Sequence, residues 1–373
     1  MRIAIATDWW LPRIGGVESQ VSDLASVLIA RGHDVRVLTT TRNPVPAAGM
    51  SAEHVTYVDV PILGDVSIPD FRRIPEFAER LRALSPDVVH AHGMFSTFAI
   101  GAVLASARVH LPSMLTVHSL LRPAPVFMAA SAVFRLFANR ATLVTGVSAA
   151  TVADVERASG REALWIPNGV RLSDWQPAPE DREAVRVLTV TRLAPKKRTI
   201  DVVRAVAAAL CRTPDGRVRL EIIGDGPERS RLEQEVMRLG LAGRVIFHGA
   251  CSRARVRELL SGAALLAHPG TREAFGLAIL EARASGVPVV AIASGGVPEL
   301  VTHETHGLLA RNHEEFGAAL ARMIQDVSLR QRCRLQAPIG LDAYDWPEVA
   351  ARFEAAYARA MSRTSARRKP GAA

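Results

Sequence analysis

The chain has 373 residues, 49% of them hydrophobic and 22% charged, which is typical of a folded globular protein and excludes a disordered one. This length exceeds the size at which one hydrophobic core usually stops growing, so two domains are expected. The net charge of +9 favours an anionic partner, such as nucleotide phosphates, an acidic membrane surface or nucleic acid.

The cysteines and the apolar runs indicate where the protein works. Cys211, Cys251 and Cys333 are far apart and lack metal-ligand spacing, which fits a reducing compartment. No apolar run is long enough for a signal peptide or a membrane-spanning helix. We therefore expect a cytoplasmic protein, either soluble or peripheral on the inner face of the plasma membrane.

Strand and helix signals alternate along the first half of the chain, which predicts a parallel sheet covered by helices. Strands are predicted at 2–6, 35–39, 55–58, 87–91, 113–117, 143–147 and 164–166, and helices at 17–30, 74–84, 97–107 and 149–158. A segment rich in proline and acidic residues follows, with the composition of a linker. These signals define an N-terminal Rossmann-like domain over 1–174 and a linker over 175–184.

The alternation restarts after the linker and predicts a second Rossmann-like domain over 185–345. Its strands are predicted at 185–190, 219–223, 245–247 and 264–267, and its helices at 199–209, 228–239, from near 275, and 314–324. A final helix is expected over 346–363, followed by a basic disordered tail over 364–373. In two doubly wound domains the loops at the carboxyl ends of the strands usually bind the ligand, so we expect a cleft where these ends face.

Two glutamates stand out in the second domain. Glu273 lies in the loop before the helix predicted near Phe275, and Glu281 follows about two turns into that helix. The free N–H groups at a helix start suit a phosphate, whereas carboxylates suit the hydroxyls of a sugar or ribose. An ordinary buried βαβ unit explains the two glutamates equally well.

Other candidate residues follow predicted strands. Gly15 and Gly16 follow the first strand, where a backbone can approach a phosphate closely. His118 ends a later strand and can donate or accept a hydrogen bond to a sugar oxygen. Arg192 and Lys197 flank a loop and suit a diphosphate without a metal ion. The alternative interpretations are plain turn residues for Gly15 and Gly16, a structural histidine for His118, and a solvated basic loop for Arg192 and Lys197.

Two further features have more than one interpretation. His90 and His92 lie two apart at a strand end, so their side chains face the same side. Zinc spacing is absent, so we expect one of them to face the ligand and the other to be satisfied in the core. The segment 122–140 mixes aromatic and basic residues, which fits an interfacial amphipathic helix or an ordinary core helix.

Taken in order, motifs along nearly the whole chain resemble the retaining glycosyltransferases of family 4. The matching stretches include IGGVESQVSDLA, DVVHAHGMFS, LTVHS, IPNGV, VTRLAPKKR, IIGDGPERSRLE, FHGA, EAFGLAILEA and GGVPELV. The N-terminal half is also similar to the catalytic subunit that starts glycosylphosphatidylinositol anchors by transferring N-acetylglucosamine. The resemblance implies the GT-B fold, in which a C-terminal helix crosses back onto the N-terminal domain.

The resemblance also implies side-chain roles. Glu273 contacts the transferred sugar near the reacting centre, and Glu281 holds the ribose hydroxyls. Arg192 and Lys197 hold the donor diphosphate. His118 lies near the hydroxymethyl group of the sugar.

Backbone contacts are implied for Gly15, Gly16, Gly249, Phe275, Gly276 and Leu277. Gly15 and Gly16 belong to a loop that closes beside the phosphates of the donor. Gly249 lies near the base, and the backbone amides from 275 to 277 contact a phosphate. This sequence departs from the family in two places: Arg198 replaces a frequent glycine, and EAFG replaces EGFG. The first departure leaves the geometry of the basic loop open.

The implied reaction transfers a sugar with retention from a nucleotide-diphosphate sugar to a sugar or lipid acceptor. The nucleotide sugar is a co-substrate, and neither a cofactor nor a metal ion is expected, since no Asp-x-Asp motif is present. A GT-B nucleotide-sugar epimerase and a non-catalytic nucleotide-sugar-binding protein are the alternatives. Nucleic acid is disfavoured because only 5% of residues are aromatic and they do not interleave with the basic ones.

Overall fold

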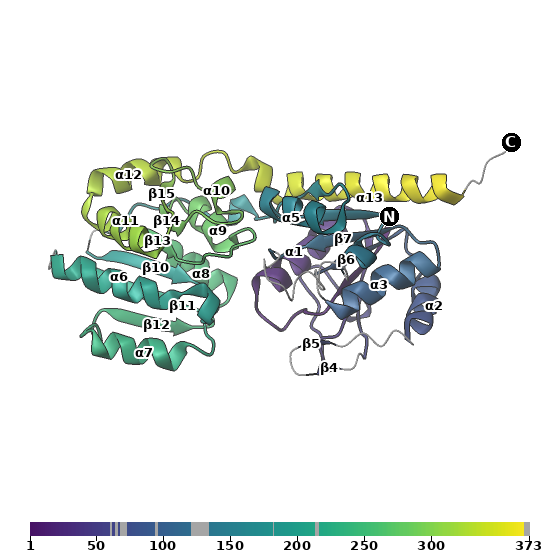
Figure 1. Ribbon diagram of the computed structural model, residues 1–373, viewed down its shortest axis with the longest axis horizontal. Coiled ribbons are helices and arrows are strands. Elements are labelled where there is room, and N and C mark those ends of the chain that lie inside the picture. The colour runs from purple at the N-terminus through teal and green to yellow at the C-terminus, as the bar shows by residue number, and fades with distance from the viewer. Residues whose placement is uncertain are drawn as a thin grey trace. The chain divides into compact units, whose positions relative to one another are not determined.

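The computed structural model describes residues 1–59, 62–63, 66–67, 73–93, 96–120, 134–181, 183–212 and 216–368. The chain divides into two compact units (Figure 1). Unit 1 comprises Met1–Gly169 and Tyr344–Ala373, and unit 2 comprises Val170–Ala343. Each unit is built around its own parallel sheet.

Unit 1 contains a seven-stranded parallel sheet in the order β3-β2-β1-β6-β7-β8-β9. Its strands are β1 Arg2–Thr7, β2 Asp34–Thr39, β3 Val55–Tyr57, β6 Val88–His92, β7 Ser113–Val117, β8 Leu143–Gly146 and β9 Leu164–Trp165. Its helices are α1 Gly16–Ala30, α2 Ile74–Leu84, α3 Thr97–Arg108, α5 Ala149–Ser159 and α13 Trp346–Arg368. A separate antiparallel pair joins β4 Ile62–Leu63 to β5 Val66–Ser67.

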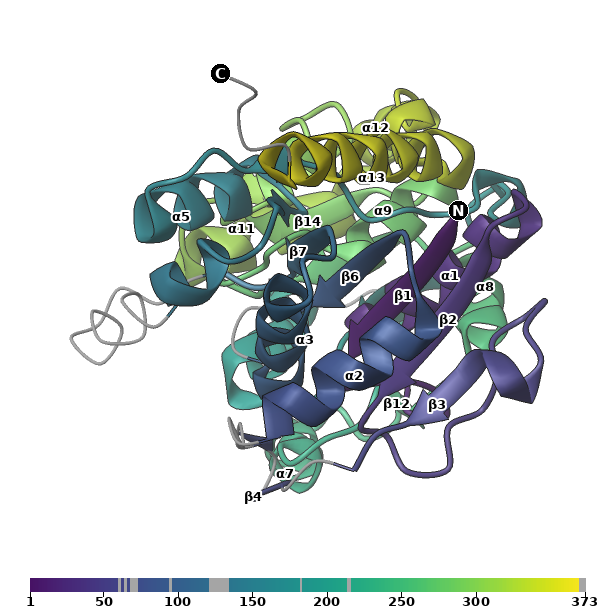
Figure 2. The same ribbon diagram turned by 90° about the vertical axis from the view of Figure 1, so that its right-hand side faces the viewer.

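Successive residues of a strand contribute apolar side chains to opposite faces of this sheet. In β1, Ile3 and Ile5 pack in one cluster with α1 and α13, whereas Ala4 and Ala6 pack in another with α2, α3 and α5. Figure 2 shows α2 and α3 side by side against the sheet. Because successive side chains of a strand point to opposite faces, apolar residues at every position require helices on both sides.

The C-terminal helix α13 is part of unit 1. Glu354 accepts two hydrogen bonds of 2.7 Å from Arg31 at the end of α1, and its Oε1 lies 2.8 Å from His33 Nε2. The Arg31 guanidinium and His33 lower the pKa of this carboxyl to about 2. Trp346 covers Gly169 so closely that a Cβ there would lie 2.6 Å from the indole ring. The start of α13 therefore packs directly on the last residue of the first segment.

Unit 2 has a six-stranded parallel sheet in the order β12-β11-β10-β13-β14-β15. Its strands are β10 Val185–Val190, β11 Val218–Ile223, β12 Val245–Gly249, β13 Leu265–His268, β14 Val289–Ile292 and β15 Gly307–Ala310. Its helices are α6 Thr199–Arg212, α7 Arg229–Arg238, α8 Arg253–Leu260, α9 Leu277–Ala284, α10 Val297–Leu300, α11 His313–Gln325 and α12 Val327–Gln336. The predicted class, two doubly wound α/β units, is confirmed.

The strand order in each unit reverses at one point. In unit 1 the reversal falls between β1 and β6, and in unit 2 between β10 and β13. Loops that leave the carboxyl ends of such neighbouring strands diverge and leave room for a ligand. The candidate residues after β1, β6, β10 and β13 therefore lie at the switch points of their own sheets.

The boundaries differ from the predicted ones in three places. The segment predicted as a linker belongs to unit 2, because Trp175 is buried there and Glu180 pairs with Arg330 at 2.8 Å. The first unit ends at Gly169, not at 174. The last helix continues to Arg368, so residues 364–368, predicted to be disordered, are helical. The composition of residues 175–184 predicted a linker, but composition does not show that Trp175 is buried in unit 2.

The segment 122–140 lies largely outside the described residues. Of its described part, residues 134–138 are helical, and Phe134 and Phe137 are buried in the core of unit 1. One face of this end of the segment packs in the core, while Arg135 and Leu136 on the other face are exposed. Among the described residues, no helix is long and apolar enough to cross a membrane.

Candidate functional site

The loops after β10 and β13 bring together the cluster of Lys197, Glu273 and His268. Lys197 Nζ donates to Glu273 Oε2 at 2.7 Å, and His268 Nε2 lies 3.1 Å from the same oxygen. The lysine sits at the end of a short 3₁₀ turn, Pro195–Lys197, and the histidine ends β13. An ammonium group has three N–H donors, so Lys197 retains donors for a bound anion while it contacts the carboxylate.

The environment keeps Glu273 ionised. Burial alone raises the pKa of the carboxyl, but the hydrogen bond and charge of His268 and the charge of Lys197 outweigh burial, and the pKa falls well below its usual range. Glu273 is therefore a fixed acceptor at neutral pH. A fixed carboxylate beside a cation suits the binding of hydroxyls next to a charged phosphate.

The helix that follows, α9, begins two residues later than predicted, at Leu277. Its N-cap Gly276 has φ +101°, a conformation that side chains rarely adopt, and no side chain caps the helix start. The Glu273 carbonyl accepts a hydrogen bond of 3.0 Å from the Gly296 amide, which ties this loop to the following glycine-rich one. Phe275 is buried beside the cap.

Glu281 lies in the second turn of α9 and is also buried, with only 6% of its surface exposed. Its Oε1 lies 3.2 Å from Nε of Arg253, the first residue of α8. The guanidinium of Arg253 stands 5.7 Å from the centre of the Trp175 ring. The two glutamates thus have different cationic partners, a lysine for Glu273 and an arginine for Glu281.

Two glycines hold the basic loop after β10 in place. A Cβ at Gly224 would lie 1.9 Å from the Thr191 carbonyl oxygen, and one at Gly226 would lie 2.4 Å from that of Leu193. The Leu193 amide also donates to the Asp225 carbonyl at 2.9 Å. The Gly-Asp-Gly turn is therefore the support against which the loop that carries Arg192 and Lys197 is built.

Within this loop, Arg198 adopts a backbone conformation that favours glycine, the residue that the family resemblance leads us to expect at this position. Its φ is +56°, in the left-handed region, and its guanidinium holds Asp201 at 2.7 and 3.2 Å. Arg192 is exposed, and among the described residues its guanidinium forms no ion pair. The structure joins Lys197 to Glu273 but not Arg192.

We expect the substitution Gly224→Ala to destabilise unit 2 by at least about 3 kcal/mol, since the methyl group would overlap a carbonyl oxygen at a positive φ. Gly243→Ala is the matched control, because a Cβ there meets no described atom within 4 Å. Urea unfolding of both variants measures the difference. Equal stability of the two variants would contradict the support role of Gly224.

Gly249, expected near the base, ends β12 with φ +69°. Its carbonyl oxygen accepts a hydrogen bond of 2.7 Å from the Gly224 amide. A Cβ at Gly249 would meet only the Arg229 guanidinium, at 3.8 Å, among the described atoms. Gly249 thus lies beside the same turn that supports the basic loop.

In unit 1, Gly15 and Gly16 lie at the start of α1, and no side chain caps this helix. A Cβ at Gly15 would lie 2.3 Å from Oε2 of Glu18, so the carboxylate covers this glycine. Glu18 is buried and pairs with Arg13 at 3.1 Å. The group that lies closest to Gly15 is thus the end of a flexible side chain of the same chain, while a Cβ at Gly16 meets no described atom within 4 Å.

The histidines of unit 1 form a buried network. His90 Nδ1 lies 2.8 Å from the Tyr357 hydroxyl and its Nε2 lies 2.7 Å from Thr116 Oγ1. His92 Nδ1 lies 3.0 Å from His118 Nε2, and the rings of His90 and His92 are 3.9 Å apart. One histidine is satisfied in the core and the other reaches His118. In the described residues, no three His, Cys, Asp or Glu side chains are grouped as metal ligands.

Burial keeps these imidazoles neutral. It lowers the pKa of His118 to about 4, and it lowers those of His90 and His92 well below their usual values, with smaller contributions from the neighbouring histidines. His118 at neutral pH therefore carries one N–H and one lone pair on its ring.

Sequence reasoning missed two partners of the glutamates. His268 directly follows the strand predicted at 264–267, where functional side chains gather, so its position was a usable signal. Arg253 had no such signal, because it begins a helix 28 residues before Glu281 and only the folded chain brings the two side chains together.

Two Rossmann-like units in one chain, with the last helix returned to the first unit, have the architecture of the GT-B glycosyltransferases. HepE of Anabaena, solved with UDP-glucose, superposes with a TM-score of 0.78 at 23% identity, over 96% of this chain and 99% of that one. Residues 14–174 match the family model Glycosyltransferase Family 4, and residues 174–338 match Glycosyl transferases group 1. The chain belongs to this family of glycosyltransferases.

Two curated relatives are similar over nearly the whole chain. The gpi3 subunit of phosphatidylinositol N-acetylglucosaminyltransferase from Schizosaccharomyces pombe is 25% identical, over 95% of this chain and 79% of its own length. D-inositol 3-phosphate glycosyltransferase from Stackebrandtia nassauensis is 28% identical, over 95% of this chain and 90% of its own length. Both are glycosyltransferases by name.

Proposed function

We propose that the protein is a retaining glycosyltransferase that moves a sugar from a UDP- or GDP-linked donor to a hydroxyl of a glycolipid or glycan. The Lys197–Glu273–His268 cluster at the switch point of unit 2 carries this proposal, because it places a cation and an ionised carboxylate on adjacent loops. The family match supports it, and so do relatives named for sugar transfer to inositol compounds.

Unit 2 binds the donor in this proposal. Lys197 and Arg192 hold the diphosphate, together with the amides from Phe275 to Leu277 at the uncapped start of α9. Glu281, oriented by Arg253, accepts hydrogen bonds from the ribose hydroxyls. The base of the donor nucleotide lies against Gly249, which has no side chain and so contacts the base with backbone atoms only.

The reaction proceeds on one face of the sugar. The bond from the anomeric carbon to the diphosphate oxygen breaks, and the acceptor oxygen bonds to that carbon from the same side, with retention. The acceptor proton passes to an oxygen of the departing diphosphate. Glu273 holds hydroxyls of the sugar, and Lys197 stabilises the charge that develops on the leaving group. This positive charge comes from side chains, so we propose that no metal ion is needed.

The second part of the proposal concerns the acceptor that receives the sugar. Inositol-containing acceptors in the names of the relatives suggest a polyol, in one case on a lipid. A net charge of +9 favours an anionic surface near such a lipid. Co-sedimentation with anionic but not with neutral liposomes at low salt tests this contact, and no sedimentation with either would count against it.

A donor panel tests the function itself. UDP-glucose, UDP-N-acetylglucosamine, UDP-galactose and GDP-mannose are compared by thermal shift and by slow donor hydrolysis, with and without excess EDTA. One nucleotide should stabilise the protein above the others, since stabilisation follows affinity. Release of a 2-epimer without an acceptor would instead identify an epimerase, and stabilisation without any turnover on an acceptor panel would identify a binding protein.

A further inference from the structure

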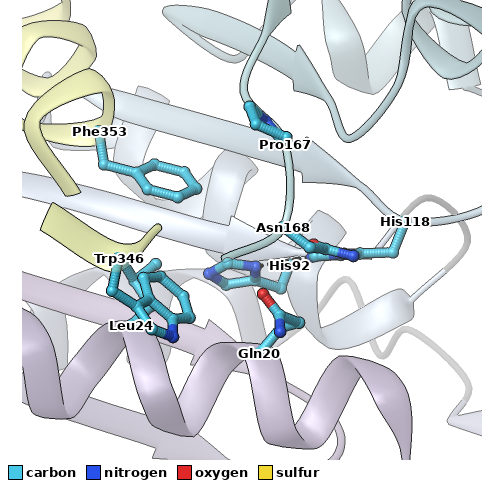
Figure 3. Close-up of a pocket in the computed structure, with 8 residues that line it drawn as sticks. All are labelled: Gln20, Leu24, His92, His118, Pro167, Asn168, Trp346 and Phe353. Atoms are coloured by element: carbon cyan, nitrogen blue, oxygen red, sulfur yellow. Dashed lines mark hydrogen bonds between the residues drawn. The ribbon is translucent and has the colours of Figure 1, made fainter. Parts of the chain in front are cut away.

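Unit 1 contains a small cavity beneath the carboxyl ends of β6 and β7 (Figure 3). Its walls come from α1, β6, the residue after β7, the segment before Gly169, and α13: Gln20, Leu24, His92, His118, Pro167, Asn168, Trp346 and Phe353. The volume is about 10 Å³, close to the least that holds one water molecule. The proposed function gives this cavity no role.

Two residues of the wall each have a buried polar atom without a partner among the described residues. These atoms are Nε2 of His92, in a residue 3% exposed, and Nε1 of Trp346, in a residue 4% exposed. The Gln20 amide, by contrast, is satisfied by the Gly169 backbone at both ends, with distances of 2.8 Å. A buried polar group without a partner costs about 1–3 kcal/mol. Two such groups in one cavity indicate a common ligand.

The chemistry of the two atoms defines that ligand. The Trp346 N–H can only donate, so the ligand must accept a hydrogen bond, which excludes a cation. Burial lowers the pKa of His92 well below its usual value, so no imidazolium is present to balance an anion. An apolar group would leave both nitrogens unsatisfied. A neutral oxygen remains, and the volume admits one.

We propose that a single buried water molecule bridges Trp346 Nε1 and His92 Nε2, and that this bridge sets the tautomer of His118. The water accepts from the indole N–H and has two hydrogens to place. Apart from the indole nitrogen, His92 Nε2 is the one buried side-chain nitrogen or oxygen of the wall that has no partner in the described residues. If Nε2 carried a proton, the water would receive two donors, and neither of its own hydrogens would find an unpartnered buried side-chain acceptor. The water therefore donates to His92 Nε2.

The tautomer of His118 follows from this direction. If His92 Nε2 accepts, its single proton is on Nδ1, which donates to His118 Nε2 across 3.0 Å. His118 Nε2 then accepts, and the proton of His118 is on its Nδ1. His118 thus presents an N–H donor, not a lone pair, from Nδ1.

The consequence for the reaction rests on the proposed function, with His118 beside the transferred sugar as the family resemblance implies. If His118 is fixed as a donor, its Nδ1–H donates a hydrogen bond to a lone pair of an oxygen atom on the transferred sugar. His118 then cannot remove a proton through Nδ1. His92 and Trp346 are then positioning residues that act through His118. The first residue of α13 thereby influences sugar binding, although it lies 228 positions after His118 in the chain.

Long-range ¹H–¹⁵N spectra of histidine-labelled protein test the tautomer directly, with His118 assigned from the His118→Gln variant. We expect His118 protonated on Nδ1 and His92 protonated on Nδ1, and a high-resolution crystal structure should show one ordered water within hydrogen-bond distance of both nitrogens. A proton on His118 Nε2, or an empty cavity, would overturn the proposal. This readout needs no turnover, so it stands apart from the outcome of the donor panel.

The variant Trp346→Phe keeps an aromatic ring on Gly169 but removes the N–H. We expect it to lose the water and to show mixed His92 tautomers, and to raise the donor KM about 3- to 10-fold with a smaller change in kcat. Trp165→Phe makes the same change at an indole that is 40% exposed and should alter none of these. An unchanged His92 spectrum in Trp346→Phe would refute the bridge.

Discussion

Glu273→Gln is expected to lower kcat on the order of 100- to 1,000-fold with a much smaller change in donor affinity, as removal of one preorganised electrostatic group does in other enzymes. The carboxylate accepts from Lys197 at 2.7 Å and lies 3.1 Å from His268 Nε2. A neutral amide of the same shape keeps the packing but removes the charge that fixes the lysine and holds the sugar. Single-turnover transfer from the donor found by the panel measures this loss.

The control for this prediction is Glu304→Gln, which removes the same charge from an exposed glutamate paired with Arg322 at 2.6 Å. It should retain the activity of the unmodified protein. Thermal unfolding of both variants shows whether each is folded. If the folded Glu273→Gln protein turned over at the normal rate, the assignment of Glu273 to the sugar would be wrong.

Glu281→Gln is expected to act on binding instead, and to weaken donor affinity about 10- to 100-fold while kcat stays within a few-fold, since a hydrogen bond to a charged group contributes about 1.5–3 kcal/mol. Its carboxylate is buried and paired with Arg253 at 3.2 Å. An amide still accepts one hydrogen bond from a ribose hydroxyl but loses the charge that strengthens it.

Titration with the nucleoside diphosphate alone isolates this effect, because the diphosphate contains the ribose but not the transferred sugar. Its affinity should fall in Glu281→Gln and change little in Glu273→Gln. The reverse pattern would exchange the two roles. Equal effects of both variants on the diphosphate would show that the two glutamates do not divide the donor between them.

Much of the fold could be predicted because its signals are local. The apolar run of β1 and the alternation of the strands and helices after it predicted each unit, with most ends correct within two residues. The start of α9 was predicted two residues early, because the left-handed Gly276 interrupts a run whose hydrophobic pattern continues through it. Trp175 was placed in a linker, because composition does not show that a side chain is buried.

The sequence by itself determined the class of fold and the family, and it placed Gly15, His118, Lys197 and Glu273 on loops at strand ends. These follow from periodicity and from motif order, which need no knowledge of distant contacts. Only the tertiary structure decided the partners: His268 for Glu273, Arg253 for Glu281, and His92 with the Trp346 cavity for His118. Strand order brings these groups together, and a hydrophobic pattern does not encode which strands become neighbours.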